Sequence, residues 1–202
     1  MNSLRRRLLG AVCLFVAAAI WGGMYVVSKY VLDYIPPMTL LAVRLVIGGA
    51  ALLLVMAASR TPRVGVRDLP RMALLGLVGF GISLAAQFIG TRLSSASHGA
   101  VITSVTPAFI LVFAATLLKE RITWAKGAAV GIATAGVLLV VEQPEGFRLE
   151  ARAFWGDLLL LVAGITWALY TVLGRLAANR HPPVTVTTYA TLAGILWVLP
   201  AI

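Results

Sequence analysis

The chain has 202 residues, of which 60% are hydrophobic and 12% are charged, and its mean hydropathy is +0.96. One core of this length could not bury so much apolar surface, so the composition excludes a water-soluble domain and indicates a protein solvated by lipid. The net charge of +10 is typical of some nucleic-acid-binding proteins, but the basic residues stand in short clusters between apolar runs, and we expect no nucleic-acid partner.

Seven apolar runs follow one another along the chain, at residues 8–32, 38–58, 72–93, 97–118, 124–141, 154–178 and 184–202. Each run is long enough to cross a hydrocarbon core of about 30 Å as a helix. None alternates apolar and polar residues, and an open sheet edge has no place in lipid, so strands are excluded. The sequence therefore predicts an all-α polytopic membrane protein with about seven transmembrane helices.

The first run resembles a signal peptide, because three arginines at 5–7 precede it and three alanines stand within it at 17–19. The apolar run continues to residue 32, however, so we interpret it as an uncleaved first helix that spans the membrane. The single cysteine, Cys13, lies within this run. It leaves no disulfide framework and no metal-ligand spacing.

The basic residues predict the orientation of the helices. If the N-terminus lies in the cytoplasm, the outer side receives only four basic residues, which are Lys29, Arg92, Arg148 and Arg152. The inner side receives twelve: Arg5, Arg6, Arg7, Arg60, Arg63, Arg67, Arg71, Lys119, Arg121, Lys126, Arg175 and Arg180. We therefore expect a multi-pass protein of the cytoplasmic (inner) membrane whose N-terminus is cytoplasmic.

Part of the chain is repeated after a shift of 146 residues. The shift aligns a tryptophan, a basic residue and a Pro-Pro pair, namely Trp21 with Trp167, Lys29 with Arg175, and Pro36-Pro37 with Pro182-Pro183. The second copy starts after five helices, which is an odd number, so it enters the membrane from the opposite side. The sequence thus predicts inverted-topology repeats, which recur in secondary transporters and place the substrate between the two copies.

The repeat predicts the domain organisation. Residues 1–142 form a first five-helix repeat, residues 143–153 an external loop, and residues 154–202 the start of a second, inverted repeat that is incomplete after about two helices. About three further helices would complete the second copy. Self-association or a partner chain is one way to supply them.

Polar and aromatic side chains in the first two runs indicate a substrate cavity. Trp21, Tyr25 and Lys29 share one face of the first helix. Arg44 lies about six residues inside the second run, and an intramembrane arginine is a functional candidate by default. Two structural alternatives remain open. One is an interfacial aromatic belt with a snorkelling lysine, and the other is a buried arginine that pairs with carbonyl groups or with Asp33 and fixes the packing.

The third and fourth runs add further candidates. Pro107 leaves the backbone carbonyl group of Thr103 without its helical hydrogen bond. Either this segment, which includes Thr106, lines a wet cavity, or threonine hydroxyl groups bind the free backbone groups. Gln87 in the third run can bind either a substrate or a neighbouring helix. With two aromatic residues of the sixth run, the cavity candidates are Trp21, Tyr25, Lys29, Arg44, Gln87, Thr103, Thr106, Pro107, Trp167 and Tyr170.

Enzymatic chemistry is not indicated by the sequence. No aspartate or glutamate stands at the centre of a run, which leaves no visible carboxylate-based proton relay, and no nucleotide-binding or catalytic motif occurs. We therefore expect no enzyme activity, no catalytic residues, and no cofactor or metal.

The order of several short motifs resembles the drug/metabolite transporter superfamily in its EamA-like branch. These motifs are Trp21-Gly22 with Lys29, Pro37 with Arg44, Thr106-Pro107, the segment 117–121, and a glycine-rich fifth run. The resemblance implies ten helices in two inverted five-helix repeats around a central cavity. Lys119 departs from the family pattern, which often has glycine at this position.

The resemblance also implies the function. We expect a secondary-type permease that moves small metabolites or drugs, including amino acids or their derivatives, by alternating access, with efflux as the expected direction. Its expected partners are the lipid bilayer and a small-molecule substrate. The alternative is a truncated or partner-dependent membrane fragment or scaffold without independent transport activity.

Overall fold

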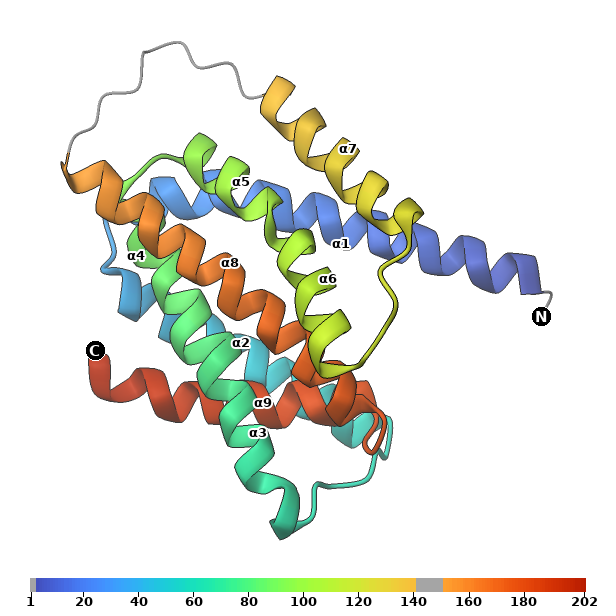
Figure 1. The fold of residues 1–202 in the computed structure, drawn as a ribbon. Coiled ribbons are helices and arrows are strands. Elements are labelled where there is room, and N and C mark those ends of the chain that lie inside the picture. The colour runs from blue at the N-terminus through green and yellow to red at the C-terminus, as the bar shows by residue number, and fades with distance from the viewer. Residues whose placement is uncertain (1–2, 141–150) are drawn as a thin grey trace.

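The computed structural model describes residues 3–140 and 151–202, and both ranges consist of helices joined by turns and short loops (Figure 1). No strand occurs in these ranges. Most of the expected external loop, at residues 143–150, lies outside the described residues. The helices are α1 (Ser3–Val31), α2 (Pro37–Ala58), η1 (Val66–Asp68), α3 (Leu69–Gly76), η2 (Leu77–Leu84), α4 (Ala85–Leu93), α5 (Ala96–Ser104), α6 (Thr106–Leu117), α7 (Trp124–Val140), α8 (Ala151–Ala178), α9 (Pro183–Val198) and η3 (Leu199–Ala201).

These helices confirm the predicted all-α polytopic fold. Six segments are long and apolar enough to cross a membrane: Arg7–Val31, Pro37–Ala58, Val66–Leu93, Ser97–Leu117, Ala153–Ala178 and Pro183–Ala201. The remaining predicted helix, the fifth in chain order, is α7 with 17 residues. The fourth predicted helix is interrupted, since α5 ends at Ser104 and α6 begins at Thr106.

The third span lies at the centre of the bundle. It consists of α3, the π-helix η2 and α4, which continue as one rod across α8 and α9 (Figure 1). Its most apolar window is 61% buried, whereas that of α1 is 0% buried, so the core forms around the third span. The side chain of Ser83 in η2 donates a hydrogen bond of 2.8 Å to the carbonyl oxygen of Ala163 in α8.

Glycines allow this close approach of the backbones. A Cβ atom added at Gly76 would lie 2.5 Å from the carbonyl oxygen of Ala190 in α9, which is too close for any side chain. A Cβ atom at Gly90 would lie 2.8 Å from the carbonyl oxygen of Gly156 in α8. Small residues at helix crossings are how membrane helices gain packing energy without a hydrophobic driving force between them.

The two Pro-Pro pairs start their helices in the same way. Pro36 precedes α2 with φ −56° and ψ 143°, and Pro182 precedes α9 with φ −55° and ψ 140°. The second proline of each pair is the first helical residue, where its missing N–H costs nothing. The aligned pairs therefore have the same local structure, while the inverted relation of the repeats stays a prediction.

The N-terminal part of α1 extends away from the other helices (Figure 1). Residues 7–23 are exposed, whereas Ser28 and Leu32 near the end of the helix are buried. In a membrane, lipid or another protein chain must cover the apolar side chains of this part.

Two helices end on residues with left-handed backbone conformation. Arg60 follows α2 with φ 50°, and Lys119 follows α6 with φ 55°. After α2, the Arg60 N–H donates to Ala57 and the Thr61 N–H donates to Met56, which is a Schellman motif. Glycine adopts this conformation without steric cost, so each of the two basic residues stores strain at its helix end.

We predict that Gly76→Ala destabilises the fold by about 1–3 kcal/mol, because its methyl group overlaps the α9 backbone. Gly127→Ala in α7 is the matched control, since nothing lies within 4 Å of an added Cβ there. The control is expected to be neutral or stabilising by up to about 1 kcal/mol. Thermal unfolding of both variants in detergent measures the difference, and equal melting temperatures would contradict the central packing.

We also predict that Lys119→Gly stabilises the protein by about 1 kcal/mol, because it relieves the left-handed strain. Lys126→Gly, in the first turn of α7, is expected to lower stability by a similar amount, since glycine weakens a helix. The two melting temperatures should therefore move in opposite directions. A decrease for Lys119→Gly would show that its backbone is not left-handed.

Candidate functional site

A cavity of about 360 Å³ lies between α1, α2, the third span, α8 and α9. Helices from both predicted repeats therefore contribute to it. Four of the predicted site residues line the cavity, namely Trp21, Arg44, Trp167 and Tyr170. The other lining residues are Met24, Leu45, Gly48, Leu52, Phe80, Leu84, Thr187 and Thr191.

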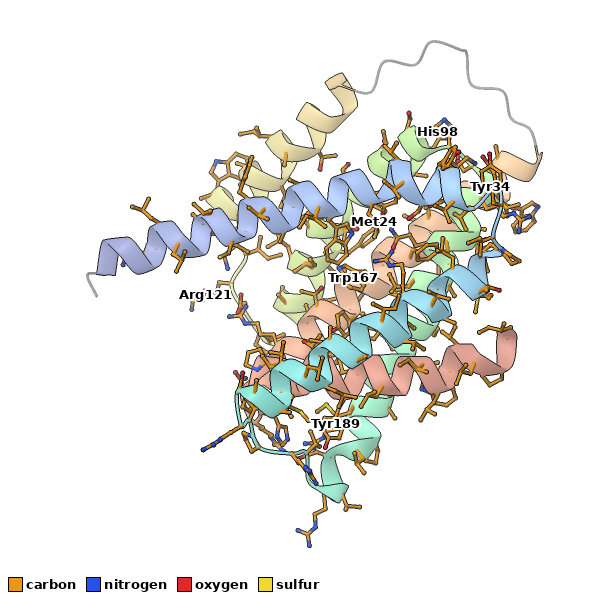
Figure 2. All side chains as sticks on the ribbon, turned by 180° about the vertical axis from the view of Figure 1, so that it is seen from behind. Met24, Tyr34, His98, Arg121, Trp167 and Tyr189 are labelled. Atoms are coloured by element: carbon orange, nitrogen blue, oxygen red, sulfur yellow. The ribbon has the colours of Figure 1, made fainter. Side chains whose placement is uncertain are left out.

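Aromatic rings form one wall of the cavity. Trp21 and Trp167 meet edge to face, with ring centroids 5.0 Å apart and an interplanar angle of 68°. Trp167 also lies 5.0 Å from Tyr170 and 6.4 Å from Phe80, measured between centroids. Edge-to-face and offset pairs at such distances are favourable. The two tryptophans that the sequence shift aligns are thus in direct contact, and Trp167 lies beside Met24 of α1 in Figure 2.

Glycines and the π-helix make room for this wall. A Cβ atom at Gly79 would lie 2.6 Å from Cγ of Tyr170, and one at Gly194 would lie 2.5 Å from Cβ of Phe80. A π-helical turn holds an additional residue and therefore changes the direction of the side chains that follow. Phe80 and Leu84, both in η2, line the cavity.

Arg44 is the only charged residue among the described residues that line the cavity. Its Nη1 atom lies 2.7 Å from Sδ of Met24, and its guanidinium carbon lies 5.2 Å from the centre of the Phe88 ring. A thioether and a ring face hold a cation without neutralising it. Within the described ranges, neither Asp33 nor any other carboxylate forms an ion pair with Arg44. The guanidinium group can therefore bind an anionic group of a ligand.

Tyr25, Gln87 and Thr103 form a second group beside the cavity. The Tyr25 side chain interacts with the side chains of Thr103 and Gln87. Its ring also packs on α5, since a Cβ atom at Gly99 would lie 3.2 Å from Cδ1 of Tyr25. None of the three lines the cavity. The structure thus shows contacts between neighbouring helices for these residues, as the alternative for Gln87 predicts.

The break between α5 and α6 is stabilised by hydroxyl groups. Thr103 donates a hydrogen bond of 2.6 Å to the carbonyl oxygen of Gly99, and Ser104 donates one of 2.6 Å to that of Val101. Thr106 packs on α8, where a Cβ atom at Gly164 would lie 3.0 Å from its hydroxyl oxygen. Pro107 is exposed, and neither residue lines the cavity.

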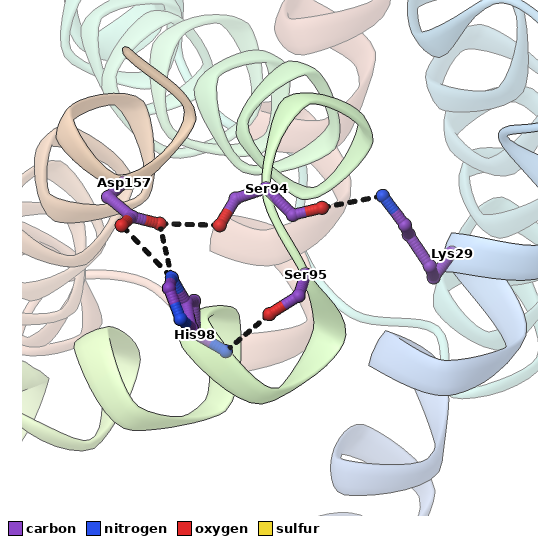
Figure 3. A network of polar contacts seen from close by, with 5 residues as sticks. All are labelled: Lys29, Ser94, Ser95, His98 and Asp157. Carbon is purple, nitrogen blue, oxygen red and sulfur yellow. Dashed lines mark hydrogen bonds and ion pairs between the residues drawn. The ribbon is translucent and has the colours of Figure 1, made fainter. Parts of the chain in front are cut away.

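Lys29 holds the end of α4 instead of lining the cavity. Its ammonium group donates hydrogen bonds to the carbonyl oxygens of Thr91, Arg92 and Ser94, at 2.9, 3.1 and 2.6 Å. The last carbonyls of a helix have no partner within the helix, and a cation there also complements the helix dipole. Figure 3 shows the contact with Ser94. Of the two roles that the sequence left open, this geometry favours the anchor.

Several lining residues were not predicted from the sequence. Phe80 and Leu84 are apolar residues in an apolar run, so nothing marked them. Thr187 and Thr191 lie one turn apart in α9, and hydroxyls at this spacing in an apolar helix are a signal that could have indicated them.

Comparison with known proteins identifies the family. The sequence profile of the EamA-like transporter family matches residues 8–142 and 154–202. The chain belongs to this family. A relative from Archaeoglobus fulgidus, described as an uncharacterized transporter, is 25% identical over 189 residues, which cover 94% of this chain and 66% of the relative. A relative from Streptantibioticus cattleyicolor, described as a probable terminal-alkyne amino-acid exporter, is 28% identical over 159 residues, which cover 78% of this chain and 52% of the relative.

A solved crystal structure shares the fold of this EamA-like chain. The TM-score is 0.66 at 22% sequence identity, and the match covers 91% of this chain and 66% of the other. The chain thus spans about half to two thirds of the length of the proteins that it matches.

We predict that Lys29→Met lowers stability by about 1–3 kcal/mol, because it leaves three carbonyl groups at the end of α4 without their donor. Lys126→Met is the control, since its exposed ion pair with Glu120, at 3.4 Å, contributes at most about 1 kcal/mol. Thermal unfolding of the two variants measures the difference. A Lys29→Met variant with unchanged stability would contradict the anchoring role.

Proposed function

We propose that this chain forms the substrate cavity of a secondary-type permease, which moves small molecules across the cytoplasmic membrane by alternating access. The observation that carries the proposal is the cavity between the two predicted repeats, with Trp21 and Trp167 in contact and Arg44 in the lining. Transporters built from inverted repeats bind their substrates between the repeats, near the middle of the membrane. The family membership of the chain supports this assignment.

The lining favours an amphipathic carboxylate as the substrate. Arg44 provides a cation that no described carboxylate neutralises, the aromatic wall provides apolar contact, and Thr187 and Thr191 add hydroxyl groups. Guanidinium groups suit carboxylates because two parallel hydrogen bonds can form. The volume of about 360 Å³ is typical of small-molecule sites. Amino acids and their derivatives have this chemistry, and the exporter description of the Streptantibioticus relative supports efflux as the direction.

A second candidate function is supported by the exposure of α1. Its most apolar window is 0% buried, so this side of the bundle is not covered by the described part of the chain. On this alternative, the chain is a partner-dependent membrane fragment or scaffold without independent transport activity. Reconstitution of the purified chain alone distinguishes the two functions, because only the first yields flux.

The substrate class is tested with amino acids and N-acyl amino acids, each measured beside its carboxamide. We expect at least one carboxylate to raise the melting temperature of the protein, while its amide does not. Arg44→Ala should weaken the binding of that carboxylate by roughly 10- to 100-fold, because a charge-assisted hydrogen bond is lost. Trp21→Ala should weaken it too, and both variants should abolish flux in membrane vesicles while they still insert.

Trp155→Ala is the matched control for the aromatic wall, since Trp155 is 59% exposed and does not line the cavity. It should bind the carboxylate like the unchanged protein. Normal binding and flux in both Arg44→Ala and Trp21→Ala would contradict the proposal.

A further inference from the structure

The two histidines of the chain each pair with an aspartate, at opposite ends of α8. Near the start of α8, Nδ1 of His98 lies 3.0 Å from Oδ2 of Asp157. Just beyond the end of α8, Nε2 of His181 lies 3.0 Å from Oδ2 of Asp68. At about 1.5 Å per residue, α8 extends about 32 Å from Asp157 to its end at Ala178, which is about the thickness of the hydrocarbon core of a bilayer.

Both pairs connect the same two parts of the chain. His98 lies in α5 and Asp68 in η1, and both belong to the predicted first repeat. Asp157 in α8 and His181 after α8 belong to the predicted second repeat. Neither end of the bundle can open along the boundary between the repeats without separating its pair.

We propose that these two pairs are the gates at the two ends of the transport path, and that each gate loosens when its imidazole loses a proton. The inference rests on the proposed function for the path itself. An imidazolium and a carboxylate attract each other as opposite charges, and this attraction is lost when the imidazole loses its proton, which leaves only a hydrogen bond to the carboxylate. Imidazole groups change their charge between about pH 5 and pH 8. An acidic compartment therefore holds the gate that faces it closed, which links the cycle to a pH difference across the membrane.

The His98 gate belongs to a polar network between α1, α4, α5 and α8 (Figure 3). Ser94 donates its hydroxyl hydrogen to Oδ1 of Asp157. The N–H of His98 donates to Oγ of Ser95, which caps α5 at 3.0 Å. The ammonium group of Lys29 binds the carbonyl oxygen of Ser94 at 2.6 Å. Opening this end thus requires the loss of contacts that centre on Asp157.

Three basic residues lie on the described helix ends around the His98 gate, namely Lys29 of α1, Arg92 of α4 and Arg152 in the first turn of α8. The described part of α6 has no charged residue, and the only one in α7 is Lys126 in the first turn. Lys and Arg keep their charge between about pH 5 and pH 8, so none of these basic residues changes its charge over that range.

The His181 gate has a different set of charged neighbours. Asp68 also pairs with Arg71 of α3 at 3.0 Å, and Arg180 acts on the same carboxylate. Arg175 of α8 pairs with Glu120 after α6 at 2.7 Å, while α9 has no charged residue. The arginines among these neighbours keep their charges over the same pH range.

A pair of spin labels at each end measures the opening without any transport assay. In a Cys13→Ser background, Tyr34→Cys with Phe154→Cys reports on the His98 end, and Val66→Cys with Asn179→Cys reports on the His181 end. All four labelled positions are exposed. The full chain is reconstituted in lipid nanodiscs, and double electron–electron resonance gives the distances at pH 5.5 and pH 8.0.

We expect the population with the longer distance to rise roughly two- to fivefold from pH 5.5 to pH 8.0 at both ends, as the loss of a salt bridge would produce. His98→Gln, which keeps a hydrogen-bonding group that does not titrate, should abolish the response at its own end and leave the response at the other end. His181→Gln should do the converse. Asp157→Asn and Asp68→Asn serve as second variants for the two gates.

Two results would contradict the proposed gates. One is distances that do not depend on pH while both histidines are present, and the other is pH responses that persist in both glutamine variants. The proposed function can fail separately. If the distances respond to pH while no carboxylate binds and no flux occurs, the gates stand and the assignment of a permease is wrong.

Discussion

The hydrocarbon core of a bilayer offers no hydrogen bonds, so the polar groups of this bundle that lie within it need partners from the protein. The described residues meet this demand, since no buried side-chain nitrogen or oxygen among them lacks a hydrogen-bond partner. The same demand places Lys29 on three carbonyl groups at the end of α4 and Ser83 on the backbone of α8. Arg44 differs from these residues, because a thioether and an aromatic ring hold it without neutralising its charge. An arginine in this state favours a binding role in a membrane, where an unpaired charge is costly to keep.

The cavity follows from how the third span is packed. Glycines at 76, 79 and 90 let its backbone approach α8 and α9 too closely for any side chain to intervene. The π-helical turn between them places Phe80 beside Trp167 and Tyr170. The resulting aromatic wall and Arg44 both line the cavity, which helices of both predicted repeats surround. The crossing of the third span over α8 and α9 therefore produces both the tight packing at the centre of the bundle and the cavity beside it.

Much of the fold could be predicted from the sequence, because lipid makes apolar runs and their ends easy to recognise. The prediction of four cavity residues had a physical reason, because polar or aromatic groups inside a membrane span are costly unless they bind something. These residues are Trp21, Arg44, Trp167 and Tyr170. The same reasoning did not separate cavity residues from residues that join helices, so Tyr25, Lys29 and Gln87 were selected with them. Lys29, for example, binds backbone carbonyl groups that lie more than 60 residues away along the chain, and no local sequence pattern encodes such contacts. Phe80 was missed because its position depends on a π-helical turn that an apolar run does not reveal.

Helices of the two predicted repeats meet at Trp21 and Trp167, where they form the wall of the cavity. Cross-linking of Trp21→Cys with Trp167→Cys by a short bismaleimide, in a Cys13→Ser background and in native membranes, tests this contact directly. The control combines Trp21→Cys with Trp155→Cys, because residue 155 lies about 18 Å further along α8. The account predicts rapid intramolecular cross-linking of the first pair and little of the control. Equal cross-linking of the two pairs, or none of the first, would contradict it.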